Sequence, residues 1–257
     1  EYPADQSTLT KRYTQEAVEF IRDSKGQPFF LYVPHTMPHL PLFVSDDFKG
    51  RTKTLFGDIM EEIDWSTGQI LQTLKDEGID DNTLVIFTTD NGTRMGSSGP
   101  LRERKASLYE GGYRVPCIAR WPGKIPAGTV CNEIAASIDM LPTIAAITGG
   151  EVPSDRIIDG HDIRPLLFAE KNAKSQHEYY ILAHGKGAAR WGDWKFYPWP
   201  EGRGRLNQPN TPVDPDKPQV QLYNLADDLG EKNNIAKDHP EIVKRLAEAY
   251  QAHTDDI

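Results

Sequence analysis

The chain has 257 residues, of which 38% are hydrophobic and 26% are charged, as expected of one large globular domain or of a core with a smaller appendage. Its formal net charge of -9 argues against nucleic acid or an anionic membrane as the main partner. No apolar run approaches the length needed to span a bilayer. An anion-binding site in this chain must therefore be a local positive pocket in an acidic protein.

The N-terminal residues predict a helix followed by a strand. Apolar residues recur at helical spacing over Ser7–Asp23, and Gly26 marks the end of that helix. Residues Pro28–Val33 form an apolar run that predicts a buried strand. The proline-rich loop after it places His35 and His39 just beyond the carboxyl end of that strand.

The longest predicted helix covers Thr54–Gly78, which carries an apolar stripe on one side. Its acidic residues are interpreted as a solvated face rather than a metal site: Asp58, Glu61, Glu62 and Asp64. The helix leads into a strand that begins at Thr83. A strand-helix-strand order predicts a parallel pair of strands in an α/β sheet.

The strand beginning at Thr83 has a continuous apolar centre, Leu84–Phe87, which predicts burial on both faces. It ends at Asp90-Asn91-Gly92, where a carboxylate and an amide oxygen stand together at the carboxyl end of the strand. Ligands bind at this end of open α/β sheets, and oxygen ligands suit calcium or magnesium. A glycine-containing loop with three cations follows: Arg102, Arg104 and Lys105. The pattern suggests a site for a tetrahedral oxyanion ester, although an ordinary turn with a solvated basic face has the same composition.

After the turn at Glu110-Gly111-Gly112, a second short apolar run covers Val115–Ala119. We expect Cys117 to be a buried free thiol there, because two cysteines, Cys117 and Cys131, do not make a disulfide framework. Asp139 is positioned to cap a helix that contains Pro142 in its first turn and ends at Gly149.

The C-terminal part has a different character from about residue 175 onward. Four short runs with turn signals between them predict a small antiparallel sheet: Glu178–Ala183, Ala188–Trp191, Trp194–Tyr197 and Val220–Tyr223. A proline- and glycine-rich loop begins at Glu201, and an amphipathic helix is expected over Glu241–Ala252.

These segments, in this order, resemble the C-terminal part of a type I sulfatase, the formylglycine-dependent arylsulfatase family of the alkaline phosphatase superfamily. The matching segments are spread in order along almost the whole chain: Pro38-His39-Leu40-Pro41, Thr89–Gly92, Leu101–Pro116, Asp139–Thr143, Trp194-Lys195 and Leu222–Asn234. The resemblance implies part of an alkaline-phosphatase-like mixed α/β sheet flanked by helices. Residues 1–174 would be the C-terminal part of the catalytic domain, and residues 175–257 a subdomain with a small antiparallel sheet and a terminal helix.

The resemblance also implies a chemistry and a set of roles. In this family a formylglycine hydrate attacks the sulfur of a sulfate monoester beside one Ca²⁺ ion. Asp90 and Asn91 would complete the shell of that ion, which acidic residues of a missing N-terminal part would share. Lys105 would hold a sulfate oxygen and balance charge on the leaving oxygen, and His39 would contact the same group and serve as the proton donor.

The formylglycine precursor is not expected within these residues. Neither Cys117 nor Cys131 fits the family's Cys/Ser-x-Pro-x-Arg motif. Ser98-Gly99-Pro100-Leu101-Arg102 fits the letters, but it follows the Asp-Asn pair instead of preceding it and lacks the Thr-Gly that completes the family motif. We interpret that match as accidental, so the chain alone is expected to be inactive.

Substrate selection would depend on residues around the proposed metal-binding and sulfate-binding residues. The family often has glycines just before the lysine, whereas this chain has Glu103-Arg104. Arg94 and Arg104 could extend the anion site. In the C-terminal sheet, His184, Lys186 and Arg190 are candidates for binding a sulfated sugar, with an ordinary exposed hairpin as the alternative.

Three functions remain open from the sequence: a sulfatase, a phosphonate or phosphodiester hydrolase of the same superfamily, and an inactive fragment that serves only as a binding module. For the first, the expected partners are a sulfated small molecule or glycan and the N-terminal part of the same enzyme. Only about three candidate parallel strands are found, fewer than the four to six of a usual sheet, which suits a chain holding one half of such a core. A periplasmic or secreted location is expected, because many bacterial relatives act on sulfated glycans.

Overall fold

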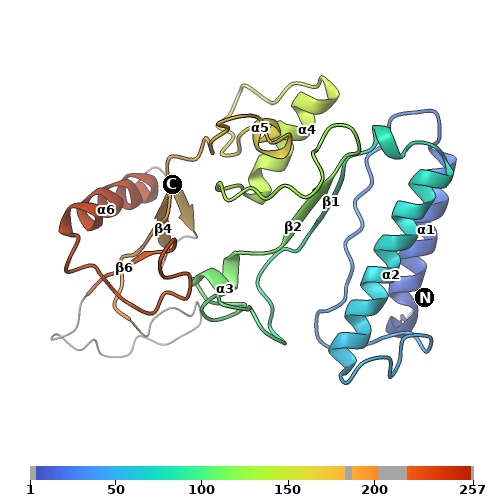
Figure 1. The fold of residues 1–257 in the computed structure, drawn as a ribbon, viewed down its shortest axis with the longest axis horizontal. Helices are drawn as coiled ribbons and strands as arrows, with labels where there is room; N and C mark the ends of the chain where they lie inside the picture. Colours follow the sequence, from blue (N-terminus) through green and yellow to red (C-terminus); the bar gives the residue numbers. More distant parts are fainter. Residues whose placement is uncertain (1–3, 183–186, 202–218, 256–257) are drawn as a thin grey trace. The chain divides into compact units, whose positions relative to one another are not determined.

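The computed structural model describes residues 4–182, 187–201 and 219–255, and these form two compact units (Figure 1). The first unit comprises residues 1–85 and 120–124, and the second comprises residues 86–119 and 125–257. The helices are α1 (Leu9–Asp23), α2 (Leu55–Asp76), α3 (Glu110–Tyr113), α4 (Met140–Thr148), α5 (Arg164–Leu167) and α6 (Pro240–Asp255). The strands are β1 (Val85–Thr88), β2 (Cys117–Arg120), β3 (Tyr180–Leu182), β4 (Ala188–Trp191), β5 (Trp194–Tyr197) and β6 (Gln221–Asn224). The described residues also contain three short 3₁₀ turns: Gln6–Thr8, Asp80–Asn82 and Ser137–Asp139.

The first unit is built on two packed helices, α1 and α2, which lie side by side (Figure 1). Ala17 and Ile21 of α1 are buried, as are Ile59 and Ile63 of α2. The hydroxyl of Thr54 caps α2 by accepting a hydrogen bond from Gly57 N at 3.0 Å. Both predicted helices are confirmed, with bounds that differ by one or two residues at the ends.

The acidic residues of α2 do not form a single solvated face, so that prediction is wrong for two of the four. Asp58 and Glu62 are buried, whereas Glu61 and Asp64 are exposed. Asp58 accepts hydrogen bonds from the backbone N–H groups of Gly50 and Thr52 at 2.8 and 2.6 Å, and these bonds lower the pKa of its carboxyl. A carboxylate that binds the backbone of the preceding loop is stable under apolar cover, and hydrophobic periodicity cannot reveal such a partner.

The predicted strand at Pro28–Val33 is also wrong for the part of the chain that the structure describes, and no parallel pair with β1 forms there. A strand needs a neighbouring backbone to take its hydrogen bonds, and this extended segment has no strand partner among the described residues. Its side chains Phe30 and Tyr32 are 71% and 75% exposed. The apolar run therefore has the composition of a core strand without the neighbours that would bury it.

Strands β1 and β2 pair as a two-stranded sheet, but β1 is not buried on both faces as the sequence predicts. Residues of β1 are half-buried or exposed, and Cys117 in β2 is an exposed free thiol rather than a buried one. Two strands cannot cover each other's faces, because a sheet is buried by the layers above and below it. At one end, Arg120 binds Asp80 through two hydrogen bonds of 2.6 and 2.7 Å.

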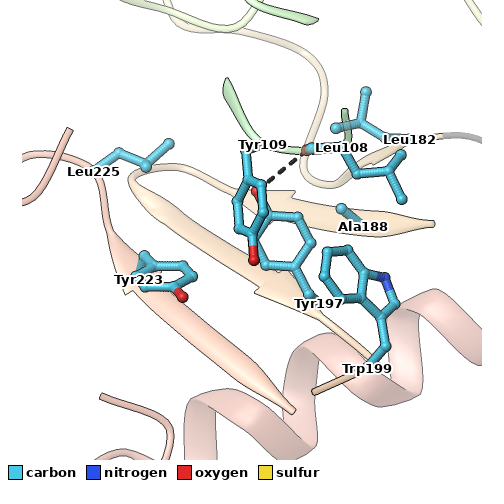
Figure 2. Close-up of a cluster of buried hydrophobic side chains, with 8 residues drawn as sticks. All are labelled: Leu108, Tyr109, Leu182, Ala188, Tyr197, Trp199, Tyr223 and Leu225. Atoms are coloured by element: carbon cyan, nitrogen blue, oxygen red, sulfur yellow. Dashed lines mark hydrogen bonds between the residues drawn. The ribbon is translucent and has the colours of Figure 1, made fainter. Parts of the chain in front are cut away.

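The C-terminal sheet confirms the predicted antiparallel sheet. Its strand order is β3-β4-β5-β6, every neighbouring pair is antiparallel, and α6 packs against β4 and β5. One core cluster packs this sheet against α6 and contains Phe196, Leu222 and Leu246. The other joins the sheet to residues Leu108 and Tyr109 and contains Tyr197, Trp199 and Tyr223 (Figure 2).

The core cluster that contains Leu108 and Tyr109 affects how the chain divides into compact units. It ties the loop that carries Lys105 to the C-terminal sheet, so both belong to the second compact unit. The compact units are divided near residues 85 and 120. This division does not test the predicted boundary between residues 174 and 175, which stays a prediction.

Helix α4 confirms the predicted helix, and Gly149 ends it in a left-handed conformation with φ of 74°. Asp139 does not cap it with its side chain. Its buried carboxylate accepts hydrogen bonds from Ala136 N at 2.7 Å and His161 N at 2.8 Å, and it lies 2.8 Å from His177 Nε2. Asp139 therefore fastens the segments before and after α4 to each other.

Candidate oxyanion and metal site

One open hollow of about 290 Å³ brings together three of the predicted site residues, Asp90, Asn91 and Lys105. Asp90 and Asn91 follow β1, and Lys105 comes from the loop before α3. The remaining lining residues are Ala106, Ser107, Gly112 and Tyr113. Residues that carry a carboxylate, an amide and an ammonium group therefore line one solvent-accessible space, and they come from two segments.

Three glycines hold these two segments in close backbone contact. Gly92 N donates a hydrogen bond to Gly112 O at 2.9 Å, and Gly111 N donates one to Arg102 O at 2.9 Å. A Cβ atom on Gly92 would lie 1.9 Å from Gly111 O, and one on Gly112 would lie 2.1 Å from Ser107 O. Since real Cβ atoms do not approach backbone oxygens so closely, only glycine allows this contact. The Asp-Asn-Gly and Glu-Gly-Gly segments thus interlock, and the interlock sets where Asp90 and Lys105 lie.

The loop that carries Lys105 is a tight turn with two residues in the left-handed region, Glu103 with φ of 62° and Ala106 with φ of 68°. Lys105 N donates a hydrogen bond to Thr93 O at 3.1 Å, which ties the lysine to the segment after Asn91. Left-handed backbone is the conformation that glycine adopts without cost. This explains why a glycine suits the position of Glu103, and it shows that the present chain keeps the turn without one.

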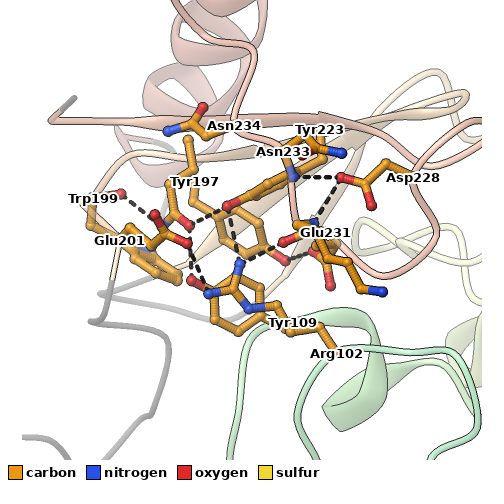
Figure 3. Close-up of polar contacts among 12 residues, drawn as sticks. Arg102, Tyr109, Tyr197, Trp199, Glu201, Tyr223, Asp228, Glu231, Asn233 and Asn234 are labelled. Atoms are coloured by element: carbon orange, nitrogen blue, oxygen red, sulfur yellow. Dashed lines mark hydrogen bonds and ion pairs between the residues drawn. The ribbon is translucent and has the colours of Figure 1, made fainter. Parts of the chain in front are cut away.

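Arg102 fixes the start of the same loop to the C-terminal sheet (Figure 3). Its guanidinium donates to Glu231 O at 2.6 Å, to Tyr223 OH at 3.2 Å and to Glu201 Oε1 at 3.1 Å. It also stacks on the ring of Tyr109, with Cζ 3.9 Å from the ring centroid. Burial raises the pKa of Tyr109 to about 12. Arg102 is therefore committed to a structural contact, and Lys105 is the basic residue of the loop that reaches the hollow.

The end of the loop is held by two buried carboxylates. Glu110 Oε1 lies 2.7 Å from Lys195 Nζ on β5, and Glu110 N donates to Glu231 Oε2 at 2.8 Å. Tyr197 OH donates to Glu231 Oε1 and also lies 3.2 Å from Leu108 O (Figure 2). Lys195 lowers the pKa of the Glu110 carboxyl against the opposing effect of burial. Lys195 and Glu231 lie in segments that match the sulfatase pattern, but their sequence context predicts no contact with Glu110.

Burial raises the pKa of the Glu231 carboxyl, and this makes the stability of the protein depend on pH. A raised pKa means that the folded state binds the proton more tightly, so wild-type stability falls as the pH rises from the ordinary glutamate range through the folded value. Glu231→Gln keeps an acceptor for Glu110 N and removes that loss. We expect the variant to gain stability relative to wild type, on the order of 1 kcal/mol, as the pH rises from 4 to 7. Urea denaturation over this pH range measures it.

The control for Glu231→Gln is Glu151→Gln, because Glu151 is exposed in the loop after α4. It should show no comparable trend. If Glu231→Gln became less stable relative to wild type as the pH rose, its carboxylate would be favoured by its surroundings, contrary to the effect of its burial.

Comparison with known proteins identifies the family. The sequence model described as Sulfatase matches residues 1–150, more than half of the chain. The chain belongs to the sulfatase family. It is similar to human steryl-sulfatase, with 40% identity over 204 residues that cover 74% of this chain and 35% of that protein. It is also similar to mouse N-acetylgalactosamine-6-sulfatase, with 37% identity over 213 residues that cover 77% of this chain and 41% of that protein.

The fold is likewise that of a sulfatase. A structure solved in work on glycosaminoglycan metabolism by Bacteroides thetaiotaomicron matches 98% of this chain with a TM-score of 0.84 and 28% identity, and the match covers 55% of that protein. The α/β class and the alkaline-phosphatase-like architecture are thus confirmed. This sulfatase chain spans less than half the length of the two curated relatives named above. No helix in the described ranges is long and apolar enough to cross a membrane.

Three of the other predicted binding residues, Arg94, Arg104 and Arg190, lie outside the lining of the hollow. Arg94 and Arg104 are exposed, and Arg104 Nη1 lies 3.4 Å from Gly96 O. Arg190 Nε donates to Gly192 O at 3.0 Å, and its Nη1 lies 3.5 Å from Glu110 Oε2. Its side chain is only 17% exposed, and a role for Arg190 in binding a sulfated sugar stays a prediction. His184 and Lys186 lie outside the described residues.

His39 belongs to the first compact unit and lies on its surface. Its Nδ1 is 2.8 Å from Leu40 O, in a loop whose two X-Pro bonds, Met37-Pro38 and Leu40-Pro41, are both cis. His35 Nε2 lies 3.4 Å from the hydroxyl of Ser66. Burial lowers the pKa of His35.

The donor set in the hollow fits part of a calcium site. Asp90 is exposed, and Thr89 Oγ1 lies 3.3 Å from its Oδ1. Asp90 and Asn91 together offer only carboxylate and amide oxygens, which are the ligands of Ca²⁺ and Mg²⁺. Calcium takes six to eight oxygens, and in the part of the chain that the structure describes no group of three or more His, Cys, Asp or Glu side chains is suited to a metal. The two residues would therefore supply one side of a larger shell.

Proposed function

We propose that the complete protein hydrolyses sulfate monoesters, and that this chain supplies the residues that bind Ca²⁺ and the sulfate group. The observation that carries the proposal is the convergence of Asp90, Asn91 and Lys105 on one open hollow. Membership of the sulfatase family supports it. A tetrahedral oxyanion needs positive charge on more than one side, and a metal opposite an ammonium group provides it.

Each residue has a distinct role in this proposal. Asp90 and Asn91 hold the Ca²⁺ ion together with acidic residues of the N-terminal part. Lys105 binds a sulfate oxygen and balances the negative charge that develops on the leaving oxygen. His39 contacts the same group and donates a proton to the leaving oxygen. The formylglycine nucleophile, which attacks the sulfur when present, would belong to the N-terminal part.

A sulfated carbohydrate is the substrate class that we propose. The name of the mouse N-acetylgalactosamine-6-sulfatase and the glycosaminoglycan context of the solved structure both support a sugar. The name of steryl-sulfatase points to a steroid ester, which makes an aryl or steryl sulfate the competing class. A periplasmic or secreted location would accompany the first choice.

The proposed partner of this chain is the N-terminal part of the same enzyme. Apolar side chains stand exposed along Pro28–Val33 and on β2, where Ile118 is 63% exposed. Segments with the composition of core strands cover such surface with further strands of the same sheet. This supports the inference that the chain alone is inactive, in preference to a free-standing binding module.

The experiment that tests the proposal is an assay of the complete protein with 4-nitrophenyl sulfate, phenyl phosphonate and a bis-aryl phosphate. We expect hydrolysis of the sulfate ester to exceed that of the other two. The reverse order would assign the site to the phosphonate or phosphodiester hydrolases of the superfamily. Loss of activity with a chelator, restored by added Ca²⁺, would support the proposed metal.

Asp90→Asn tests the metal role directly. Removal of one carboxylate charge from an oxygen shell weakens calcium binding, so the Ca²⁺ concentration that restores half of the activity should rise about tenfold or more. Asp227→Asn is the matched control, because Asp227 is exposed in the turn after β6. An unchanged calcium requirement in Asp90→Asn would remove Asp90 from the metal shell.

A further inference from the structure

Lys195 is buried in a way that lysines rarely are. It lies in the middle of β5, only 1% of its side chain is exposed, and its Nζ is 2.7 Å from Glu110 Oε1. The ammonium group also lies 5.7 Å from the centroid of the Tyr197 ring. A buried charge is tolerated only with a partner of opposite charge, so Lys195 and Glu110 depend on each other.

Glu110 is joined directly to the glycines that shape the hollow. Gly111 follows it, and a Cβ atom there would lie 2.3 Å from Glu103 O. Gly112 comes next, lines the hollow and accepts the hydrogen bond from Gly92 N. A shift of the Glu110 backbone is therefore transmitted to the lysine turn on one side and to the Asp-Asn-Gly segment on the other. These contacts join backbone atoms directly, with no side chain between them that could adjust to a shift.

We propose that Lys195 and Glu110 are positioning residues, through which the C-terminal sheet sets the distance between Lys105 and the Asp90-Asn91 pair. The inference rests on the proposed function of those three residues. Neither Lys195 nor Glu110 lines the hollow, so neither is a catalytic residue in this proposal.

The other charged groups around Glu110 are weaker anchors. Arg190 Nη1 and Arg114 Nη1 lie 3.5 and 3.9 Å from Glu110 Oε2, and both side chains are more exposed than that of Lys195. The carboxylate of Glu231 accepts a hydrogen bond from the backbone N–H of Glu110. The side-chain carboxylate of Glu110 is bound by Lys195. Lys195 on β5 is therefore the main contact that sets the position of the Glu110 carboxylate.

A neutral pair separates positioning from stability. Replacement of both members of a buried ion pair by neutral groups of similar volume often leaves stability unchanged, whereas removal of one leaves an unpaired charge. We therefore compare Lys195→Met, the double variant Lys195→Met with Glu110→Gln, and the surface control Lys244→Met, whose side chain is 77% exposed. All are measured in the complete protein, well below the unfolding temperature of each variant.

We expect the double variant to unfold within a few degrees of wild type and yet to lose about tenfold or more in kcat/KM for 4-nitrophenyl sulfate, since small misplacements of binding groups are costly in the transition state. The affinity for inorganic sulfate as an inhibitor should fall with it. Lys244→Met should change neither. A double variant with wild-type stability and wild-type kcat/KM would overturn the positioning role.

Amide hydrogen exchange gives a second readout that does not require activity. The N–H groups of Gly92, Lys105 and Gly111 are hydrogen-bonded within the interlock. They should exchange at least tenfold faster in the double variant, with unchanged exchange in β4 and β6. Unaltered exchange at all three would refute the inference. If Lys105→Ala retained activity while this exchange still accelerated, the proposed function alone would fail.

Discussion

Lys105→Ala is expected to lower kcat/KM for a sulfate monoester by about 10²–10³-fold in the complete protein, the usual effect of removing one group that stabilises charge in a transition state. The backbone of Lys105 is fixed by its N–H bond to Thr93 O, and its side chain reaches the hollow that Asp90 and Asn91 share. Truncation at Cβ thus removes the ammonium group and leaves the turn in place. Steady-state kinetics with 4-nitrophenyl sulfate measures the loss.

Two variants determine whether the effect belongs to this ammonium group. Lys244→Ala removes an equal charge from the exposed face of α6 and should leave kcat/KM unchanged. Lys105→Arg keeps the charge with a different shape, so it should retain more activity than Lys105→Ala but less than wild type. Full activity in Lys105→Ala would remove Lys105 from the site and with it the sulfate-binding role of the hollow.

The C-terminal sheet shows how far local pattern carries a prediction. Strands β4 and β5 have the predicted bounds, Ala188–Trp191 and Trp194–Tyr197, because each is a short apolar run next to a turn. Their antiparallel pairing follows from the two-residue connection between them. The sequence also predicted a shared site for Asp90 and Lys105, because Asp90 ends a predicted strand, Lys105 lies in the basic loop that follows, and both match the sulfatase pattern. Local signals sufficed where the partner is close in sequence.

The contacts that the sequence did not reveal join distant residues. Lys195 and Glu110 are 85 positions apart, and no periodicity announces that a strand lysine will meet a carboxylate from a different segment. Asp58 and Glu62 read as surface residues because their burial depends on the loop before α2 and on Ser45, whose N–H lies 3.2 Å from Glu62 Oε2. The strand expected at Pro28–Val33 failed for the opposite reason, since its composition was right and its neighbours are absent from the described residues.

Gly111→Ala is expected to destabilise the second compact unit by about 3 kcal/mol, at the upper end of the usual cost of overpacking. The added methyl group would lie 2.3 Å from Glu103 O and 2.5 Å from Arg102 O. Neither atom can move alone, because the Arg102 side chain is held by Tyr223 on β6, by Glu201 after β5 and by the backbone of Glu231 after β6. The loop must therefore separate from α3, and the hydrogen bond from Gly111 N to Arg102 O is lost with it.

Urea denaturation measures the stability of Gly111→Ala and of the control Gly68→Ala. The control separates the effect of close packing from the general effect of a glycine-to-alanine change. Gly68 lies inside α2 with no atom within 4 Å of the Cβ position, so alanine there should stabilise by roughly 0.5–1 kcal/mol through helix propensity. The two glycine-to-alanine changes thus have opposite expected signs. A stable Gly111→Ala protein would mean that the loop and α3 can separate freely, and the interlock could then no longer explain how Asp90 and Lys105 come to share one hollow.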